Sequence, residues 1–119
     1  MSKSLLIVSR QPPWSGPSAR EALDIALAGG AFDLPIGMLF LDDGVLQLVG
    51  SQQPGTLQQK DLSANLQALP LFGVEALYAS TRSLQERGLD GQALALAIET
   101  LDDAALTALI DRYDQVITL

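Results

Sequence analysis

Two neighbouring carboxylates, Asp42 and Asp43, are the residues of this sequence whose type and position first suggest chemistry. They follow the apolar run 34–41, whose composition is typical of a strand buried on both faces of a parallel sheet. Carboxylates at the carboxyl ends of such strands bind hard cations such as Mg²⁺ or accept phosphoryl groups. A phosphoacceptor site also needs a lysine near a later strand end, and the only lysines are Lys3 and Lys60. We therefore favour an acidic turn that caps a short helix over a metal site.

The chain contains no cysteine and no histidine. It therefore lacks the ligands of the common zinc and copper sites, and it has no residue for a disulfide or a thiol nucleophile. Catalysis by serine–histidine or cysteine–histidine pairs is excluded for the same reason. We expect no catalytic residue, no metal site and no cofactor in this chain.

Fourteen acidic and seven basic residues give a formal net charge of −7. Because phosphate contacts come mainly from lysine and arginine, we expect no direct binding of nucleic acid. No apolar run approaches the ~20 residues that span a bilayer, and the N-terminus lacks the basic flank and cleavage site of a secretory leader. The expected location is the cytoplasm.

The segment 10–18, between the first predicted strand and helix, is the place where doubly wound folds bind phosphates through backbone N–H groups. Its spacing matches neither G-x-G-x-x-G nor G-x-x-x-x-G-K-[ST], and its three prolines remove donors. A stand-alone small-molecule or phosphate-binding module is therefore the alternative function, and we rank it second.

An apolar patch follows the two carboxylates, where a solvated connection should be polar. We interpret it as a surface that a partner covers, because the chain combines 48% apolar with only 18% charged residues. Arg82 and Arg87 lie on a predicted short helix; most such charges are solvated, but they could pair with acids of a neighbouring subunit. The predicted partner interface comprises Asp42, Asp43, Val45, Leu46, Leu48, Arg82 and Arg87.

These residues require a scaffold in which strands and helices alternate. Five strands are expected, at 4–9, 34–41, 74–79, 93–98 and 115–119. Four helices are expected between them, at 18–30, 56 to 70 or 73, 80–87 and 100–112. The segment 93–98 is rich in alanine and leucine and fits a helix as well, but we favour a strand. The expected fold is α/β: a single doubly wound three-layer domain over residues 1–119 with a mainly parallel five-stranded sheet.

Polar and glycine residues predict where the helices begin and end. Ser18 and Glu21 have the capping-box spacing, and the pair Gly29-Gly30 should end the first helix. The later caps are expected at Ser80 or Thr81 and within 100–103, and the later ends at Pro70 or Gly73 and at Gly88.

Several stretches, in this order, carry a resemblance to a known family. They are Arg20-Glu21-Ala22-Leu23-Asp24, Phe40-Leu41-Asp42-Asp43-Gly44-Val45-Leu46-Gln47-Leu48, Ser83-Leu84-Gln85-Glu86-Arg87-Gly88-Leu89 and Tyr113-Asp114. Together they resemble the TusC (DsrF-like) family of small sulfur-relay proteins, over nearly the whole chain.

The resemblance implies a DsrE/DsrF-like fold and a non-catalytic structural role in a TusBCD-like complex. Its partners would be TusB-like and TusD-like subunits, in a heterohexamer of two heterotrimers. Such a complex transfers persulfide sulfur toward 2-thiolation of the tRNA wobble uridine, and the resemblance places the sulfur-carrying cysteine on the TusD-like subunit. The absence of cysteine from this chain agrees with that division, because a persulfide needs a thiol.

Overall fold

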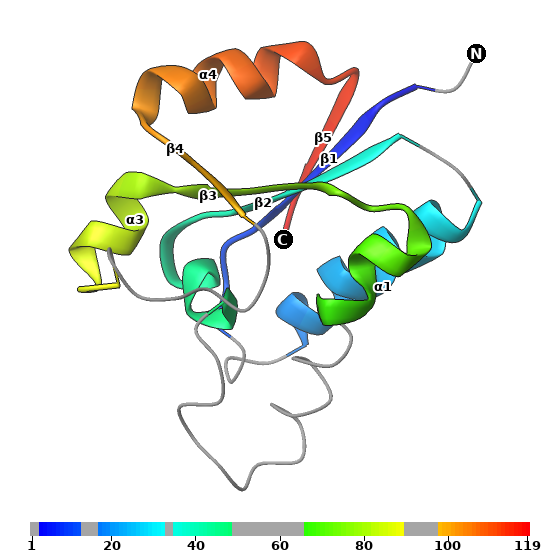
Figure 1. Ribbon diagram of the computed structural model, residues 1–119, viewed down its shortest axis with the longest axis horizontal. Helices are drawn as coiled ribbons and strands as arrows, with labels where there is room; N and C mark the ends of the chain where they lie inside the picture. The colour runs from blue at the N-terminus through cyan, green and yellow to red at the C-terminus, as the bar shows by residue number, and fades with distance from the viewer. Residues whose placement is uncertain (1–2, 13–16, 33–34, 49–65, 90–97) are drawn as a thin grey trace, which may run out of the picture.

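A five-stranded sheet, parallel throughout, is the centre of the computed structural model, which describes residues 3–12, 17–32, 35–48, 66–89 and 98–119. The strands are β1 (Leu5–Ser9), β2 (Ile36–Phe40), β3 (Ala76–Ser80), β4 (Glu99–Leu101) and β5 (Gln115–Thr118). The α-helices are α1 (Ser18–Ala31), α3 (Thr81–Glu86) and α4 (Asp103–Arg112), and two 3₁₀ helices are η1 (Asp42–Leu48) and η2 (Leu69–Phe72) (Figure 1). The predicted α/β fold class is confirmed.

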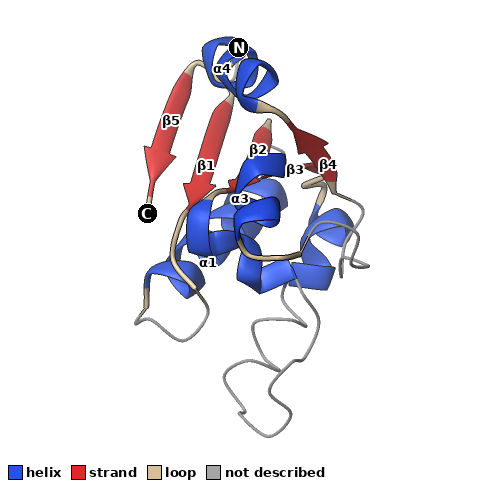
Figure 2. Cartoon of the chain, turned by 90° about the vertical axis from the view of Figure 1, so that its left-hand side faces the viewer, coloured by secondary structure: helices blue, strands red, loops and turns tan. Residues whose placement is uncertain are grey.

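The strand order is β4-β3-β2-β1-β5, so the chain steps in one direction from β1 to β4 and then returns to the far side of β1. Because parallel crossovers are right-handed, the reversal moves the last helix to the other face of the sheet. Figure 2 shows α4 on one face and α1 on the other. Within the described ranges, no helix combines the length and apolar character that a bilayer-spanning segment needs.

The face that α1 covers holds most of the core. Every residue of β2 is buried, and Met38 and Phe40 pack there with Leu23 of α1. Gly30 lets α1 pack closely against η2, because a Cβ at this position would lie 2.5 Å from the Phe72 carbonyl oxygen. The prediction that Gly29-Gly30 ends the helix is therefore wrong, because these glycines are buried packing positions inside α1.

The start of α1 also differs from the expected capping box. Pro17 occupies the N-cap position with helical dihedral angles, and no side chain caps the helix. Ser18 is already helical, so it lacks the extended backbone that a capping serine requires. The backbone N–H of Glu21 donates to the Pro17 carbonyl oxygen at 2.9 Å instead.

The caps of the two later helices follow the sequence. Ser80 accepts a hydrogen bond from the Ser83 N–H at 3.1 Å and caps α3, and Gly88 follows the helix with a φ of 67°. Asp102 caps α4 by accepting from the Ala105 N–H at 2.8 Å. These predictions are confirmed, since α4 begins within the expected segment and ends at Arg112.

Two elements are displaced from their predicted positions. The fourth strand is Glu99–Leu101, in part of the segment that we assigned to a helix start; 93–97 lies outside the described residues. Most of the helix predicted from 56 also lies outside them, but its end is described. Pro70 is tolerated near the start of η2, and the turn ends at Gly73, whose φ of 87° favours glycine.

The face that α4 covers is less completely buried. Leu6, Val8 and Leu39 pack there against Leu109, the one residue of α4 that is fully buried. The other apolar residues of this cluster are only partly buried; they are Leu41, Tyr78, Leu101, Leu106 and Tyr113. Among the helices that the structure describes, α4 alone covers this side of the five-stranded sheet.

Candidate functional site at the carboxyl ends of the strands

The turn after β2 connects three elements through Asp42. This residue has a φ of 51°, a left-handed conformation that aspartate adopts more easily than most residues. Its backbone N–H donates to the Ser83 Oγ at 2.9 Å, and its carboxylate accepts from Arg10 at 2.7 and 2.8 Å. The ends of β1 and β2 and the start of α3 are therefore held together by polar contacts.

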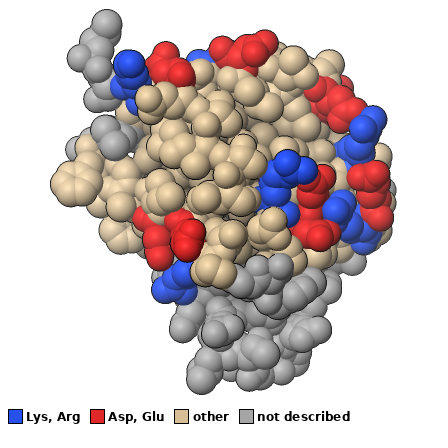
Figure 3. Space-filling model, turned by 180° about the vertical axis from the view of Figure 1, so that it is seen from behind, with Lys and Arg blue, Asp and Glu red and all other residues tan. Residues whose placement is uncertain are grey.

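Asp43 pairs with a different arginine. The Nε of Arg87 donates to Asp43 Oδ1 at 2.9 Å, and its Nη1 donates to the Ser83 carbonyl oxygen at 3.1 Å. Arg82 pairs with Asp103 of α4 at 2.7 Å. Acids of this chain thus pair with Arg82 and Arg87, for which the sequence suggested solvent or, as the alternative, acids of a neighbouring subunit. Figure 3 shows basic and acidic side chains alternating along this edge.

This geometry favours the acidic turn over a cation site. The carboxylates of Asp42 and Asp43 contact two different arginines, which neutralise them separately. Within the described ranges, no three or more His, Cys, Asp or Glu residues form a group that could hold a metal. The short helix expected near Gly44 is η1, and it begins two residues earlier, at Asp42.

The apolar patch that follows lies inside the chain. Val45 and Leu48 are 0% exposed and belong to the core on the α1 face, and Leu46 is partly buried against it. A Cβ at Gly44 would overlap the Ser9 carbonyl oxygen, so the turn packs directly on the end of β1. The expectation that Val45 and Leu48 form an outward surface is therefore wrong: their own domain covers them.

Gln47 is a site residue that the sequence prediction missed. It is 5% exposed, and its Nε2 donates to the Ser9 Oγ at 2.8 Å and to the Gln11 carbonyl oxygen at 3.0 Å. Its Oε1 is buried without a hydrogen-bond partner among the described residues. The available signal was one amide within an apolar segment, since buried polar groups usually form hydrogen bonds. The segment 10–18, which we considered as the alternative phosphate-binding loop, includes Gln11, but 13–16 lies outside the described residues.

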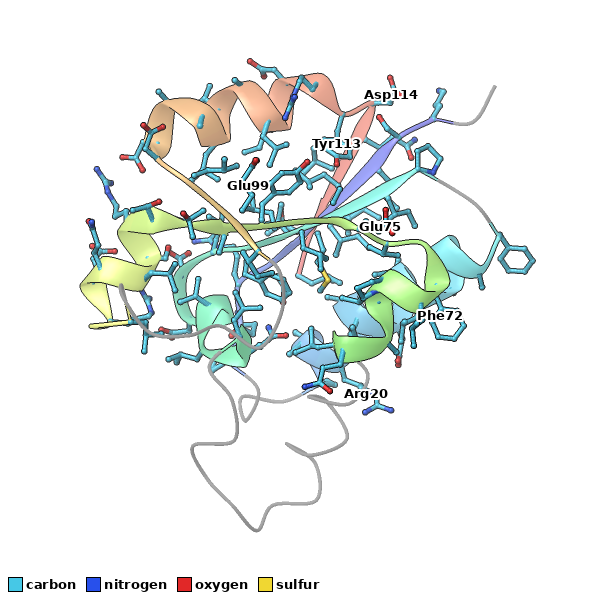
Figure 4. All side chains as sticks on the ribbon, in the orientation of Figure 1. Arg20, Phe72, Glu75, Glu99, Tyr113 and Asp114 are labelled. Atoms are coloured by element: carbon cyan, nitrogen blue, oxygen red, sulfur yellow. The ribbon has the colours of Figure 1, made fainter. Side chains whose placement is uncertain are left out.

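A second polar group lies at the opposite end of the sheet, where the strands begin. Asp114 accepts hydrogen bonds from the backbone N–H and the Oγ of Ser4, at 2.8 and 3.1 Å. The backbone hydrogen bond is the main reason why the pKa of Asp114 is lowered. The pKa of Tyr113 is raised to about 12, mainly by burial. The charge of Tyr78 and a hydrogen bond with Tyr78 raise it further. Figure 4 shows Tyr113 between α4 and the sheet.

Comparison with protein families shows which family the chain belongs to. The model of the DsrE/DsrF-like family matches residues 3–119. The chain belongs to the DsrE/DsrF-like family. The resemblance to TusC is also confirmed, because three curated relatives of similar length bear that name.

Each of these relatives is called "Protein TusC homolog". The protein from Pseudomonas aeruginosa is 75% identical over 119 residues and covers both chains completely. That from Haemophilus influenzae is 39% identical, over 92% of this chain and 93% of the relative. That from Vibrio vulnificus is 32% identical, over 96% and 97%.

A solved structure supports the fold. The YchN protein of Escherichia coli superposes with a TM-score of 0.82 over 100% of both chains, at 20% sequence identity. At this identity the likeness shows the fold alone. A DsrE/DsrF-like domain is thus established by sequence and its architecture by structure.

Proposed function

We propose that this protein is a non-catalytic structural subunit of a TusBCD-like sulfur-relay complex. Such a complex transfers persulfide sulfur toward 2-thiolation of the tRNA wobble uridine. One observation carries the proposal: a chain 75% identical to a TusC homologue has no cysteine among its 119 residues. Because a persulfide requires a thiol, the sulfur in transit has to be held by a partner.

The end of β3 illustrates why this chain does not hold the sulfur. Ser80 lies there, 3% exposed, and its Oγ accepts the Ser83 N–H that begins α3. A buried hydroxyl with a capping role is no substitute for an accessible thiolate. We therefore place the sulfur-carrying cysteine on a TusD-like partner.

The proposed partners are a TusB-like and a TusD-like subunit, in a heterohexamer of two heterotrimers. The outer edge of β5 is the contact surface that we propose, because it is an edge strand without charged residues. Val116 and Ile117 are 40% and 38% exposed although they point to opposite faces of the sheet. Figure 3, which views the molecule from this edge, shows a broad area without charged side chains.

A second proposed contact lies at the carboxyl ends of the strands. It comprises the residues of the predicted partner interface that are not fully buried: Asp42, Asp43, Leu46, Arg82 and Arg87. Their ion pairs are already satisfied within the chain, so a partner would gain little by adding charge. The net charge of −7 supports a subunit that contacts other proteins in the cytoplasm and does not grip tRNA itself.

Co-expression with the TusB-like and TusD-like proteins, followed by native mass spectrometry, tests the proposal. A heterohexamer that contains this chain is expected. Val116→Asp and Ile117→Asp should remove this chain from the complex, because a desolvated charge is costly at an interface. The control is Ala28→Asp, an exposed position of α1 outside both proposed contacts, which should assemble normally.

A chain that stays monomeric beside both partners would overturn the subunit proposal. Normal assembly of both β5 variants would instead show that β5 is not the contact. Circular dichroism of each variant establishes that the fold is retained.

A further inference from the structure

A cavity of about 480 Å³ opens at the amino ends of β2 and β3, under the last turn of α4. Its volume lies within the roughly 300–1,000 Å³ of small-molecule sites. Pro35 and Ala76 give it an apolar wall, and Tyr78 and Tyr113 add two aromatic rings. It lies at the opposite end of the strands from the arginine–aspartate cluster.

The two phenols are fixed by the sheet beside them. A Cβ at Gly37 would overlap the Tyr113 hydroxyl oxygen, so the glycine provides the space in which this ring sits. Tyr113 is partly buried and forms a hydrogen bond with Tyr78. Because its pKa is raised to about 12, its hydroxyl stays neutral at physiological pH. The interior of the cavity is thus uncharged, aromatic and preorganised.

The charges of this cavity lie on exposed side chains at its rim, Glu75 and Arg112. Neither makes an ion pair or a hydrogen bond with another residue in the described part of the chain. The other four arginines each pair with a carboxylate. One free charge of each sign therefore faces a cavity with an aromatic interior.

We propose that this cavity binds a small zwitterion with an apolar side chain, of the kind represented by a free aromatic amino acid. Its carboxylate pairs with Arg112, its ammonium group pairs with Glu75, and its side chain contacts Ala76 and the two tyrosine rings. A simple anion would meet the like charge of Glu75 and a chain of net charge −7, and a simple cation would meet Arg112. Only a ligand with both charges neutralises both rim residues. The inference does not depend on the relay function.

Three matched probes test the inference on the full chain by ¹H–¹⁵N NMR titration: L-phenylalanine, phenethylamine, which lacks the carboxylate, and 3-phenylpropanoate, which lacks the ammonium group. Phenylalanine should bind at least tenfold more tightly than either analogue and shift the amide signals of residues 75–78 and 112–113. Binding of phenylalanine no tighter than that of the analogues would overturn the zwitterion assignment, and no binding would overturn the site.

Charge-neutral variants assign the two contacts. Arg112→Gln should weaken phenylalanine and 3-phenylpropanoate at least fivefold but should bind phenethylamine at least as tightly as the parent, because the repulsion between Arg112 and the probe's ammonium group is removed. Glu75→Gln should weaken phenylalanine and phenethylamine but should bind 3-phenylpropanoate at least as tightly as the parent, because the repulsion between Glu75 and the probe's carboxylate is removed. The controls, Arg82→Gln and Glu86→Gln, lie on α3 at the other end of the sheet and should bind all three probes as the parent does. Equal effects of rim and control variants would contradict the proposed site.

Discussion

The two faces of the sheet differ in how completely they are buried. Seventeen buried residues of the described ranges form the core on the α1 face, whereas four form the core on the α4 face. The first face is closed by α1, η1 and η2 together, and the second mainly by α4. The α1 face therefore provides most of the stability, and the α4 face carries the open cavity at its amino-terminal edge.

A matched pair of leucine truncations should show the largest difference. Leu23→Ala on α1 removes a side chain that is 0% exposed, and it should lower the free energy of unfolding by about 2–5 kcal/mol. Leu106→Ala on α4 removes a partly buried one, and about 1 kcal/mol is expected. Both changes replace leucine by alanine in a helix, so urea denaturation compares burial directly. Equal losses would show that the two faces contribute alike.

Gly30→Ala tests how tightly the α1 face is packed. In an open helix this change stabilises by about 1 kcal/mol. Here the new Cβ would lie 2.5 Å from the Phe72 carbonyl oxygen and 2.7 Å from Val74 Cγ2. We expect a net loss of about 1–3 kcal/mol in the free energy of unfolding, measured by urea denaturation. A more stable variant would mean that α1 and η2 can separate without cost.

Tyr113, on the α4 face, should titrate at a higher pH than an ordinary tyrosine. Because the pKa of Tyr113 is raised from 10.0 to about 12, its stabilising effect is present below pH 10 and is lost as the pH rises toward 12. Ultraviolet titration should resolve an inflection near 12, which Tyr113→Phe removes. The same variant should cost about 1 kcal/mol at pH 7 through its lost hydrogen bond. Two tyrosines that both titrate near the ordinary value would contradict the observed burial.

The smallest effect is expected at the edge of the α4 face, where Asp114 joins Ser4. Since the folded-state pKa of Asp114 is lowered from 3.8, its contribution is present above that pH and is lost on further acidification. Asp114→Asn should therefore lower the melting temperature slightly at pH 7, and the difference should close below pH 3.8. The control, Asp111→Asn, changes an exposed acid of α4 and should have no effect at either pH.

The sequence predicts the sheet because β2 is buried on both faces and has no polar position. It also predicts the caps at Ser80 and Asp102, since these depend on residues close in the chain. It does not distinguish a glycine that ends a helix from Gly30, which packs within one. That difference depends on Phe72, 42 residues away in the sequence.

The candidate site shows the same limit. The acidic turn was predictable from the composition after β2, but its partners Arg10 and Arg87 come from other elements. Val45 and Leu48 were misplaced because an apolar residue looks alike whether its own domain or a partner covers it. Only the packing of η1 on the end of β1 decides between these alternatives.

The strand order has a consequence for synthesis on the ribosome. β1 is synthesised before the other four strands of the sheet, but its second neighbour, β5, is synthesised after them, and Ser4 meets Asp114 across 110 positions. The buried core on the α1 face comes from residues up to Leu89, so it can assemble before β4, α4 and β5 have been synthesised. One edge of β1 stays unpaired until β5 has been synthesised. Nascent chains therefore expose an edge of β1 that the finished domain covers with β5, and this unpaired edge makes association with other chains a hazard until β5 has emerged.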